Sequence, residues 1–512
     1  MIDLAMAPLQ AGAAKWGKVI DHSRCIGCHA CSTACKSENE VPLSVNRTYV
    51  KYVDIGTFPA TRRAFQVTRC NQCQDAPCVT ACPTAAMHKR PDGIVDFDKS
   101  ICIGCKACIA ACPYDAIFIN PDDHSAEKCN FCAHRLDVGL EPACVVVCPT
   151  QAILVGDLND PSAYVARLVH RDAVTVRRPE KATRPKLFYK NAHQATLDPL
   201  AARRPDGGLF MWSEQPSGSH AVVSGDPTGG NSSAAALLAY DVGHTAPWDW
   251  RVSLYTWTKG IAAGAYLVPA LLLLFNVVSP ADPLWLWVAP VLAGVFLGAT
   301  GVLLIWDLEH PERFYYIFTR SQWKSWLVRG AIIIGAYSAV LAAHFAASVL
   351  DLATVQRWLT IAGIPLSLGT AVYTAYLFAQ AKARDLWQDP LLPPHLAVHA
   401  ALGGAGALLP FTVFWGPELV TPLLWILAAS SAIHLLLVFG EASLTHPTAH
   451  AKLAAWEMSR GRYAVYFWLG NFLTLLALAA PWIGWIAGPI ALAGLLAHEH
   501  AYVQAGQAVP LA

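Results

Sequence analysis

Sixteen cysteines hold most of the chemistry available to this sequence, and all of them lie between residues 25 and 148. They form four groups: Cys25, Cys28, Cys31 and Cys35; Cys70, Cys73, Cys78 and Cys82; Cys102, Cys105, Cys108 and Cys112; and Cys129, Cys132, Cys144 and Cys148. The first and third groups have the spacing C-x2-C-x2-C-x3-C, which is typical of thiolate ligands around an iron–sulfur cluster. The sequence therefore predicts enough ligands for four 4Fe–4S clusters.

Other uses of cysteine fit this pattern less well. Disulfide frameworks belong to small secreted domains, and zinc sites present paired C-x2-C knuckles rather than four cysteines in one run. The segment Cys25-Ile26-Gly27-Cys28-His29 matches the C-x-x-C-H motif of c-type haem attachment. Both of its cysteines belong to a complete cluster motif, however, so we favour the iron–sulfur interpretation.

An internal repeat surrounds these cysteines. Three groups end in Cys-Pro, and similar tails follow: Pro83-Thr84-Ala85-Ala86-Met87, Pro113-Tyr114-Asp115-Ala116-Ile117 and Pro149-Thr150-Gln151-Ala152-Ile153. Proline ends the helix after the ligand, and in such runs the fourth cysteine usually binds the other cluster of a two-cluster unit. The repeat predicts a duplicated α+β ferredoxin domain. Short strands are expected over 93–97 and 152–155, and we expect 183–198 to pack on the same domain.

The rest of the chain is too apolar for an ordinary soluble protein. Of 512 residues, 54% are hydrophobic and only 14% are charged, whereas soluble chains average about 25% charged residues. The net charge of +1 argues against a nucleic-acid partner. Eight apolar segments of spanning length follow residue 250, at 256–278, 284–306, 326–350, 357–380, 393–415, 421–441, 463–480 and 483–503. Eight in succession favour an all-α, eight-helix transmembrane bundle over buried soluble helices.

Three domains follow from this composition. We expect a cluster domain over 1–199, a linker rich in Gly, Ser, Pro and Asp over 200–250, and the transmembrane domain over 251–512. The first 25 residues contain no apolar run of the kind that a secretory signal needs. Residues 61–65 resemble a twin-arginine core but lack an apolar segment behind them, and we expect a surface loop there.

Loop charges predict how the bundle is oriented. One side of the eight segments carries nine basic residues: Arg313, Arg320, Lys324, Arg329, Lys382, Arg384, Lys452, Arg460 and Arg462. The other side carries only Arg357. The basic side is also the side of the cysteines, and basic loops face the cytoplasm. The prediction is therefore a multi-pass protein of the inner (cytoplasmic) membrane, with its cluster domain on the cytoplasmic side.

Two family resemblances add to these expectations. The four cysteine groups, with Lys128-Cys129-Asn130-Phe131-Cys132 and Glu141-Pro142-Ala143-Cys144, resemble the four-cluster electron-transfer subunit of complex iron–sulfur molybdoenzymes of the dimethylsulfoxide and polysulfide reductase type. This resemblance covers about residues 15–200. The apolar half is similar to the NrfD/polysulfide-reductase membrane anchor, an eight-helix quinone-reactive family. That likeness rests on the segments Asp307 to Phe314, Ser325-Trp326 and Val503 to Leu511.

The resemblance to the four-cluster subunits implies nested ligation. Four sets of cysteines would each hold one cluster: Cys25, Cys28, Cys31 and Cys148; Cys129, Cys132, Cys144 and Cys35; Cys70, Cys73, Cys78 and Cys112; and Cys102, Cys105, Cys108 and Cys82. Some relatives lack the first cysteine of the third group. Cys102 is present here, so a three-iron or haem variant at that position is not implied.

A quinone that exchanges electrons with these clusters should bind near the cluster end of the bundle. The hydrogen-bond donors expected there, all candidate quinone-binding residues, are Tyr255, Lys259, Asp307, His310, Tyr373 and Tyr376. Alternatively, Tyr255 fits an interfacial aromatic belt, and the Lys259 ammonium could extend to the membrane surface. Farther along, His399, His434 and Glu441 could line a proton route, and the paired histidines could instead bind b-haem, although we favour interhelical hydrogen bonds.

Two functions remain after these observations. The favoured function is an electron-transfer and membrane-anchor subunit of a quinone-linked respiratory molybdoenzyme, working with menaquinone or ubiquinone. No part of the chain is left for a molybdopterin domain, so the active site for the terminal substrate should lie on a partner subunit. The alternative is an iron–sulfur and quinol module of an alternative-complex-III-like complex with cytochrome partners. A membrane sensor is less favoured, because no output domain is recognisable.

Overall fold

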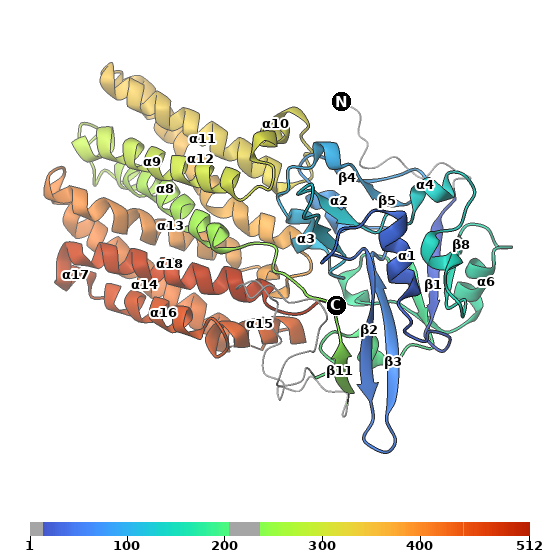
Figure 1. The fold of residues 1–512 in the computed structure, drawn as a ribbon. Coiled ribbons are helices and arrows are strands. Elements are labelled where there is room, and N and C mark those ends of the chain that lie inside the picture. The colour runs from blue at the N-terminus through green and yellow to red at the C-terminus, as the bar shows by residue number, and fades with distance from the viewer. Residues whose placement is uncertain (1–13, 204–235, 444, 512) are drawn as a thin grey trace.

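The computed structural model describes residues 14–203, 236–443 and 445–511. Strands and short helices gather at one end of the molecule, and long helices form a bundle at the other (Figure 1). The predicted fold class, an α+β ferredoxin-like domain followed by a helical membrane domain, is confirmed. The predicted linker over 200–250 falls largely on residues outside the described ranges.

Two sheets and two hairpins build the cluster domain. The first sheet has the order β8-β1-β10-β9, in which β1 (Trp16–Asp21) runs parallel to β10 (Leu187–Lys190) and antiparallel to β8 (Ile153–Asp157). The second sheet has the order β11-β2-β3. The remaining strands are β2 (Thr48–Ile55), β3 (Arg62–Arg69), β4 (Met87–Lys89), β5 (Val95–Phe97), β6 (Ile117–Ile119), β7 (Ala126–Lys128), β9 (Val174–Thr175) and β11 (Ala236–Tyr240). The expected strands near 93–97 and 152–155 are confirmed, and β10 confirms that 183–198 packs on this domain.

The predicted repeat appears as repeated backbone geometry. After each Cys-Pro, a residue with positive φ turns the chain: Ala85 at 58°, Asp115 at 49° and Gln151 at 50°. A strand then begins, namely β4, β6 and β8. β4 pairs with β5, and β6 pairs with β7, as matching antiparallel hairpins.

Short helices carry five of the sixteen cysteines. The helices of the cluster domain are α1 (Ala30–Glu38), α2 (Pro77–Ala81), α3 (Ala107–Ala111), α4 (Ala133–Leu136), α5 (Ala143–Val146), α6 (Tyr164–Arg171) and α7 (Gln194–Leu197). Of these, α1, α2, α3 and α5 each contain at least one cysteine of the motifs. Short 3₁₀ segments connect the elements of the chain: η1 (Lys99–Ile101), η2 (Pro179–Lys181), η4 (Pro311–Arg313), η5 (Asp385–Gln388), η6 (Leu409–Val413), η7 (Pro417–Leu419) and η8 (Gly484–Ile486).

The bundle follows the predicted apolar segments closely. Its long helices are α8 (Trp250–Leu274), α9 (Ala289–Trp306, after a π-helical turn η3 at Leu284–Val288), α11 (Trp326–Val349), α12 (Ala353–Gln380), α13 (Leu392–Leu408), α14 (Val420–Ser443), α16 (Ala464–Ala477) and α18 (Ala487–Gln507). Short helices α10 (Tyr316–Thr319), α15 (Ala449–Ser459) and α17 (Ala480–Ile483) lie between them. In the described ranges, seven spans are long and apolar enough to cross a membrane, and the 14-residue α16 is shorter.

Glycines let α8 and α13 approach closely at the centre of the bundle. A Cβ added to Gly264 would lie 1.8 Å from the carbonyl oxygen of Ala400, and one added to Gly404 would lie 2.3 Å from the oxygen of Gly264. Small residues at such crossings bring backbones together, which is how helices associate without a hydrophobic driving force in lipid. α8 also contacts α9, α12 and α18, so it is the central helix of the domain.

Two segments differ from the loops that the sequence suggested. The segment 61–65 lies at the surface as expected, but Arg62 begins β3 instead of a loop. Pairing with β2 explains this, because Arg63 forms an ion pair with Asp54 of β2 at 2.7 Å. Within the expected linker, residues 236–240 form β11, which adds to the edge of β2 with Ala236 and Leu238 buried.

A largely buried histidine links the cluster domain to the segment that leads into the bundle. His244 Nδ1 lies 2.5 Å from Asp115, and its Nε2 lies 3.1 Å from Asp241. Burial lowers the pKa of His244, but the two carboxylates outweigh it and raise the pKa to about 9. His244 therefore stays protonated, and stabilises the folded state, at pH values where an ordinary histidine is neutral.

This pair of contacts predicts pH-dependent stability. A histidine whose pKa is raised on folding contributes fully below about pH 6.5, and the contribution is lost as the pH rises through about 9. The shift corresponds to roughly 3 kcal/mol. We expect the unfolding midpoint in detergent to fall between pH 6.5 and 9.5, and this fall to be absent in His244→Asn. The exposed His170→Asn should behave as the wild type; an unchanged profile in His244→Asn would contradict the assignment.

Candidate iron–sulfur and quinone sites

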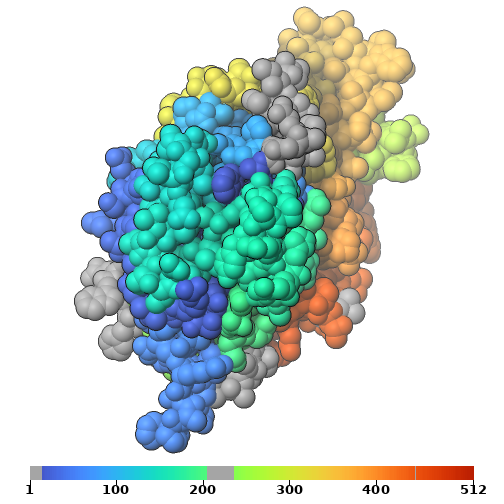
Figure 2. Space-filling view, turned by 90° about the vertical axis from the view of Figure 1, so that its right-hand side faces the viewer, coloured from blue at the N-terminus to red at the C-terminus, as the bar shows by residue number. Residues whose placement is uncertain are grey.

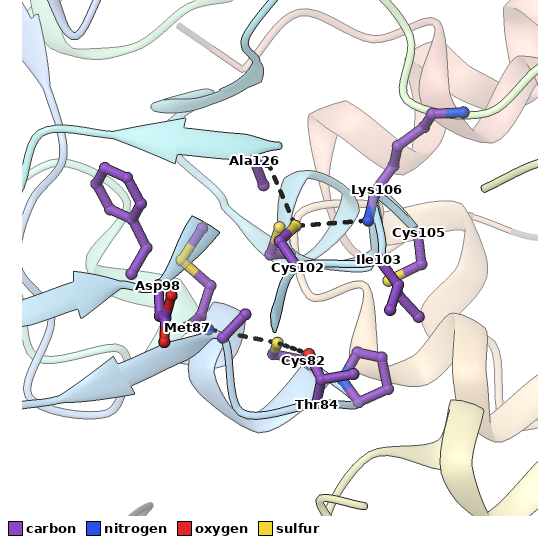
Figure 3. A pocket seen from close by; sticks show the side chains of 14 residues that line it. Cys82, Thr84, Met87, Asp98, Cys102, Ile103, Cys105, Lys106 and Ala126 are labelled. Carbon is purple, nitrogen blue, oxygen red and sulfur yellow. Dashed lines mark hydrogen bonds between the residues drawn. The ribbon is translucent and has the colours of Figure 1, made fainter. Parts of the chain in front are cut away.

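Four cysteines line one cavity at the end of the cluster domain that faces the bundle. We call this the proximal site: Cys82, Cys102, Cys105 and Cys108. Figure 3 shows the thiols of Cys82, Cys102 and Cys105 around this space. Backbone amides point at the sulfurs: Met87 N–H donates to Cys82 Sγ, and Ala126 N–H to Cys102 Sγ, each at 3.4 Å. Such hydrogen bonds stabilise thiolates and tune a bound cluster.

The remaining cysteines gather in three similar sets. The distal site consists of Cys25, Cys28, Cys31 and Cys148, and the third site of Cys70, Cys73, Cys78 and Cys112; each set lines its own cavity. In the second site, Cys35 neighbours Cys129, Cys132 and Cys144. Asn39 Nδ2 lies 3.6 Å from Cys35 Sγ and 3.8 Å from Cys132 Sγ. All sixteen thiols are free. The sets are the same four that the family resemblance implies.

A repeated turn explains why each motif encloses a space. The second residue after the first cysteine of every group has a positive φ: Gly27, Gln72, Gly104 and Phe131, between 48° and 68°. This turn points the amide of Gln72 at Cys70 Sγ at 3.5 Å, and that of Gly104 at Cys102 Sγ at 3.4 Å. The C-x2-C spacing thus bends the backbone around its own ligands.

Buried cations at the second site fit a negatively charged group there. Arg69 Nη1 donates to Cys144 Sγ at 2.9 Å, and Lys18 Nζ donates to the same sulfur at 3.7 Å. Burial raises the pKa of the Cys144 thiol, but these two charges lower it to about 7. The Nε and Nη2 atoms of Arg69 are buried and have no partner among the described residues. A 4Fe–4S cluster held by these cysteines would supply hydrogen-bond acceptors and negative charge beside this guanidinium.

Arg69 should therefore set the potential of the second site. Replacing it with methionine removes a positive charge beside the ligands, which disfavours the more negative reduced state. We expect Arg69→Met to lower that cluster's reduction potential by roughly 100 mV, the effect of a unit charge about 6–7 Å away at an effective dielectric constant near 20. A redox titration followed by EPR measures the shift. Arg63→Met, on the exposed part of the same strand, should leave all potentials unchanged; equal potentials in both variants would contradict the role.

The four sites lie in a row. Neighbouring sulfurs identify the order: Cys31 of the distal site lies near Cys144 of the second, Cys129 of the second near Cys70 of the third, and Cys78 of the third near Cys108 of the proximal. Cys28 of the distal site is exposed. The proximal site packs against the membrane domain, because α3 shares a hydrophobic core with Tyr255 and Phe378 of the bundle.

Side chains of the bundle hold the proximal loop in place. Trp248 Nε1 donates to the carbonyl of Cys105 at 3.2 Å, and its ring stacks 5.6 Å from that of Trp387. Lys106 Nζ donates to the backbone oxygen of Asp307 at 2.9 Å. Gly104 has a φ of 68°, and a Cβ there would lie 2.4 Å from that of Glu309, so only glycine fits this contact. The loop directly after α9, which contains Asp307 and Glu309, therefore packs closely against the proximal site.

Three of the six candidate quinone residues meet inside the bundle. Lys259 Nζ donates to the carbonyl of Ala371 and to Thr374 Oγ1, each at 2.7 Å, and lies 4.9 Å from the centre of the Tyr373 ring. Tyr255 and Tyr373 both lie within reach of Thr374. These side chains are buried and come from α8 and α12. The three side chains therefore supply hydrogen-bond donors inside the bundle, near the side of α3 that faces it.

The other three candidates lie elsewhere. Asp307 pairs with Lys106 at 3.5 Å; burial raises the pKa of this carboxyl to about 6, although Lys106 and Arg251 lower it. His310 contacts the backbone oxygen of Asp123 at 2.9 Å, so it fastens the two domains together. Tyr376 is 41% exposed and stacks on Trp326. Sequence reasoning missed Lys106, Trp248 and Thr374, because an ordinary loop lysine, one tryptophan among 18 and a helical threonine carry no motif.

Comparison with known proteins identifies both parts of the chain. The family described as Polysulphide reductase, NrfD matches residues 241–510, more than half of the sequence. This protein belongs to the NrfD family. A 4Fe-4S dicluster domain also matches residues 61–158. This NrfD-family protein is therefore a multi-pass membrane protein that carries an electron-transfer iron–sulfur domain on the same polypeptide.

The relatives that match part of the chain include subunits of reductases. The NrfD-family protein is 40% identical over 205 residues to a tetrathionate reductase subunit of Salmonella typhimurium, covering 39% of this chain and 80% of the relative. It is 42% identical over 179 residues to a polysulfide reductase polypeptide of Wolinella succinogenes, covering 34% and 94%. It is 37% identical over 224 residues to a putative dimethyl sulfoxide reductase iron-sulfur subunit of Halobacterium salinarum, covering 38% and 86%.

Proposed function

We propose that this chain relays electrons between a molybdopterin-containing catalytic subunit and the quinone pool through four 4Fe–4S clusters. The observation that carries the proposal is the row of four cysteine sites, which runs from the exposed distal site to the proximal site against the bundle. Bound clusters would accept and pass on single electrons. The sixteen cysteines would hold them, and Arg69, Lys18 and the backbone amides would tune their potentials.

The quinone end of the pathway would use Tyr255, Lys259 and Tyr373. A quinone carbonyl needs hydrogen-bond donors, and these three side chains supply them from two adjacent helices. An ionisable group inside a membrane domain is costly and by default suggests a function. Asp307, a buried carboxyl at the cluster end of α9 that pairs with Lys106, would be the group that exchanges protons between that end and water.

The partner would dock at the distal site. Three apolar side chains that flank its cysteines are exposed: Ile26 at 56%, Val146 at 62% and Val147 at 39%. Figure 2 views the domain from the side opposite the bundle, and the segment with α4, α5 and α6 (teal) occupies the centre of that face. Exposed apolar side chains next to an exposed cluster ligand suit a protein–protein contact. Such a contact would bring the partner's redox centre close to the distal cluster.

Metal content of the purified complex tests the whole proposal. We expect molybdenum, a large co-purifying subunit and about sixteen iron atoms per chain from four cubes. Cytochrome partners with haem and no molybdenum would instead indicate an alternative-complex-III-like assembly and would overturn the molybdoenzyme assignment. Iron near eight per chain would overturn the four-cluster count separately.

Charge substitutions test the docking surface. The double variant Ile26→Glu and Val146→Glu should lose the molybdenum subunit on affinity purification while retaining its iron. Phe58, 91% exposed at the tip of the β2–β3 hairpin, provides the matched control as Phe58→Glu. The hairpin projects away from the rest of the domain (Figures 1 and 2). Retention of the partner by the double variant would place the contact elsewhere.

We further propose that the chain lies in the inner (cytoplasmic) membrane with its cluster domain in the cytoplasm. The support is the basic bias of the loops on the cluster side of the bundle. In inverted membrane vesicles, where the cytoplasmic face is outside, added protease should cut within residues 200–237. In right-side-out vesicles the same residues should be protected. Cleavage only in right-side-out vesicles would reverse the topology.

A further inference from the structure

Four histidines from three membrane helices converge at one point of the bundle. His395 and His399 come from α13, His434 from α14 and His498 from α18. One ring nitrogen of each lies within 4.8 Å of those of the other three. All four side chains are at least 95% buried. The candidate quinone site and the cysteine sites do not include any of them.

The distances between the rings suit a shared metal ion. His434 Nδ1 lies 3.0 Å from His395 Nε2 and 3.1 Å from His399 Nε2. Four ligands at a metal–nitrogen distance of 2.0–2.1 Å in a tetrahedron are about 3.3 Å apart. The observed separations lie close to that edge, so small side-chain shifts would complete the coordination.

Hydrogen bonding alone leaves this group unsatisfied. His434 Nδ1 faces two nitrogens but carries either one proton or one lone pair, so it can pair fully with only one of them. His498 Nδ1 is buried without a partner among the described residues. Unpaired polar atoms in such surroundings are costly. A cation at the centre would engage the lone pairs that point toward one another.

Glu499 provides the support that metal-bound histidines usually have. Its Oε1 lies 3.0 Å from His399 Nδ1, and both side chains are buried. An imidazole that donates one N–H to a carboxylate is held in the tautomer whose other nitrogen binds a metal. His399 Nε2 is the nitrogen that faces His434. The carboxylate would also offset part of the charge of the ion.

We propose that His395, His399, His434 and His498 bind one first-row transition-metal ion of the kind that prefers imidazole, with Glu499 orienting His399. The ion would fasten α13, α14 and α18 together inside the membrane domain. A haem is excluded by the packing, because every measured pair of the four rings has centroids within 5.7 Å, which leaves no room for a porphyrin between them.

Zinc binding to the full-length, cluster-loaded chain tests the site. After mild anaerobic treatment with a chelator that leaves the iron content unchanged, the detergent-purified protein is titrated with Zn²⁺, and bound zinc is counted by mass spectrometry. We expect one Zn²⁺ per chain, with X-ray absorption showing nitrogen ligands at about 2.0 Å. Failure to retain zinc, or a first shell of sulfur at about 2.3 Å from cluster cysteines, would overturn the proposal. This measurement on the wild-type protein tests the metal site without relying on the folding of any variant.

Variants separate the ligands from other buried histidines. His434→Ala should reduce zinc affinity more than 10-fold, and Glu499→Gln by about 10–100-fold, as for supporting carboxylates elsewhere. His344, buried in α11 and bonded to Tyr266 at 3.0 Å, is the matched control as His344→Ala and should bind zinc as the wild type does. Iron content and an unchanged elution volume in size-exclusion chromatography check that each variant is folded in both domains. Equal zinc binding by His434→Ala and His344→Ala would refute the assignment.

Discussion

Replacing Cys105 with alanine is expected to slow quinol-driven reduction of the remaining clusters by at least about 100-fold, equivalent to about 2.7 kcal/mol of activation free energy. The proximal site is the one whose helix α3 shares a core with the bundle, so its loss leaves a gap between the membrane and the other three sites. Iron should fall from about sixteen to about twelve per chain. Stopped-flow absorption after adding a quinol analogue measures the rate.

A second cysteine variant distinguishes the loss of the proximal cluster from the loss of any one cluster. Cys28→Ala removes a ligand of the distal site, at the other end of the row. It should lose a similar amount of iron, yet quinol should still reduce its three remaining clusters at nearly the wild-type rate. Electron transfer to the partner should be lost instead. If the two variants lost quinol-driven reduction equally, the proposed order of the sites would be wrong.

Replacing Lys259 with methionine should weaken binding of a quinone analogue by about 10–100-fold, because leaving a buried quinone carbonyl without its hydrogen-bond donor costs about 1–3 kcal/mol. Methionine keeps most of the volume of the side chain, so packing between α8 and α12 should change little. Fluorescence quenching by the analogue measures affinity, and quinol oxidation should show an increased KM. The cluster spectra should remain those of the wild type.

Thr258 supplies the control on the same helix. It is buried beside Lys259, but its hydroxyl faces α9, where it bonds to Thr300 at 2.8 Å. Thr258→Val should therefore bind the quinone analogue with unchanged affinity. If both variants bound it as tightly as the wild type, the Tyr255, Lys259 and Tyr373 group would serve structure only, and the quinone would bind elsewhere.

Local patterns predicted most of the fold. Cysteine spacing and the Cys-Pro tails indicated the duplicated α+β domain, because each tail encodes the same turn and strand. Apolar length placed most membrane helices within a few residues; η3 and α9 together occupy the predicted 284–306, and α11 occupies the predicted 326–350. The β2–β3 hairpin was missed because its inward positions include Lys51, Gln66 and Thr68, which obscure the alternation of a strand.

Contacts between distant segments were beyond sequence reasoning. His395 and His399 are spaced as neighbours on one helix face, but nothing in the order of residues shows that His434 and His498 join them. The basic loops illustrate a different limit. Arg313 donates to the carbonyl of Cys102, and Arg384 to those of Gln507 and Val509. These charges hold the fold together as well as contributing to the bias from which the orientation was inferred.

The uneven exposure of the ligand cysteines has a consequence for damage by oxygen. Cys28 is exposed, and Cys25 and Cys148 of the same site are partly exposed, whereas the cysteines of the second site are buried. Oxidants and chelators would therefore attack the distal site first, since thiolate oxidation follows exposure. An isolated chain kept in air should lose iron in steps, beginning at the end away from the membrane. A docked partner would cover that weak point, so the assembled complex should tolerate air longer than the chain alone.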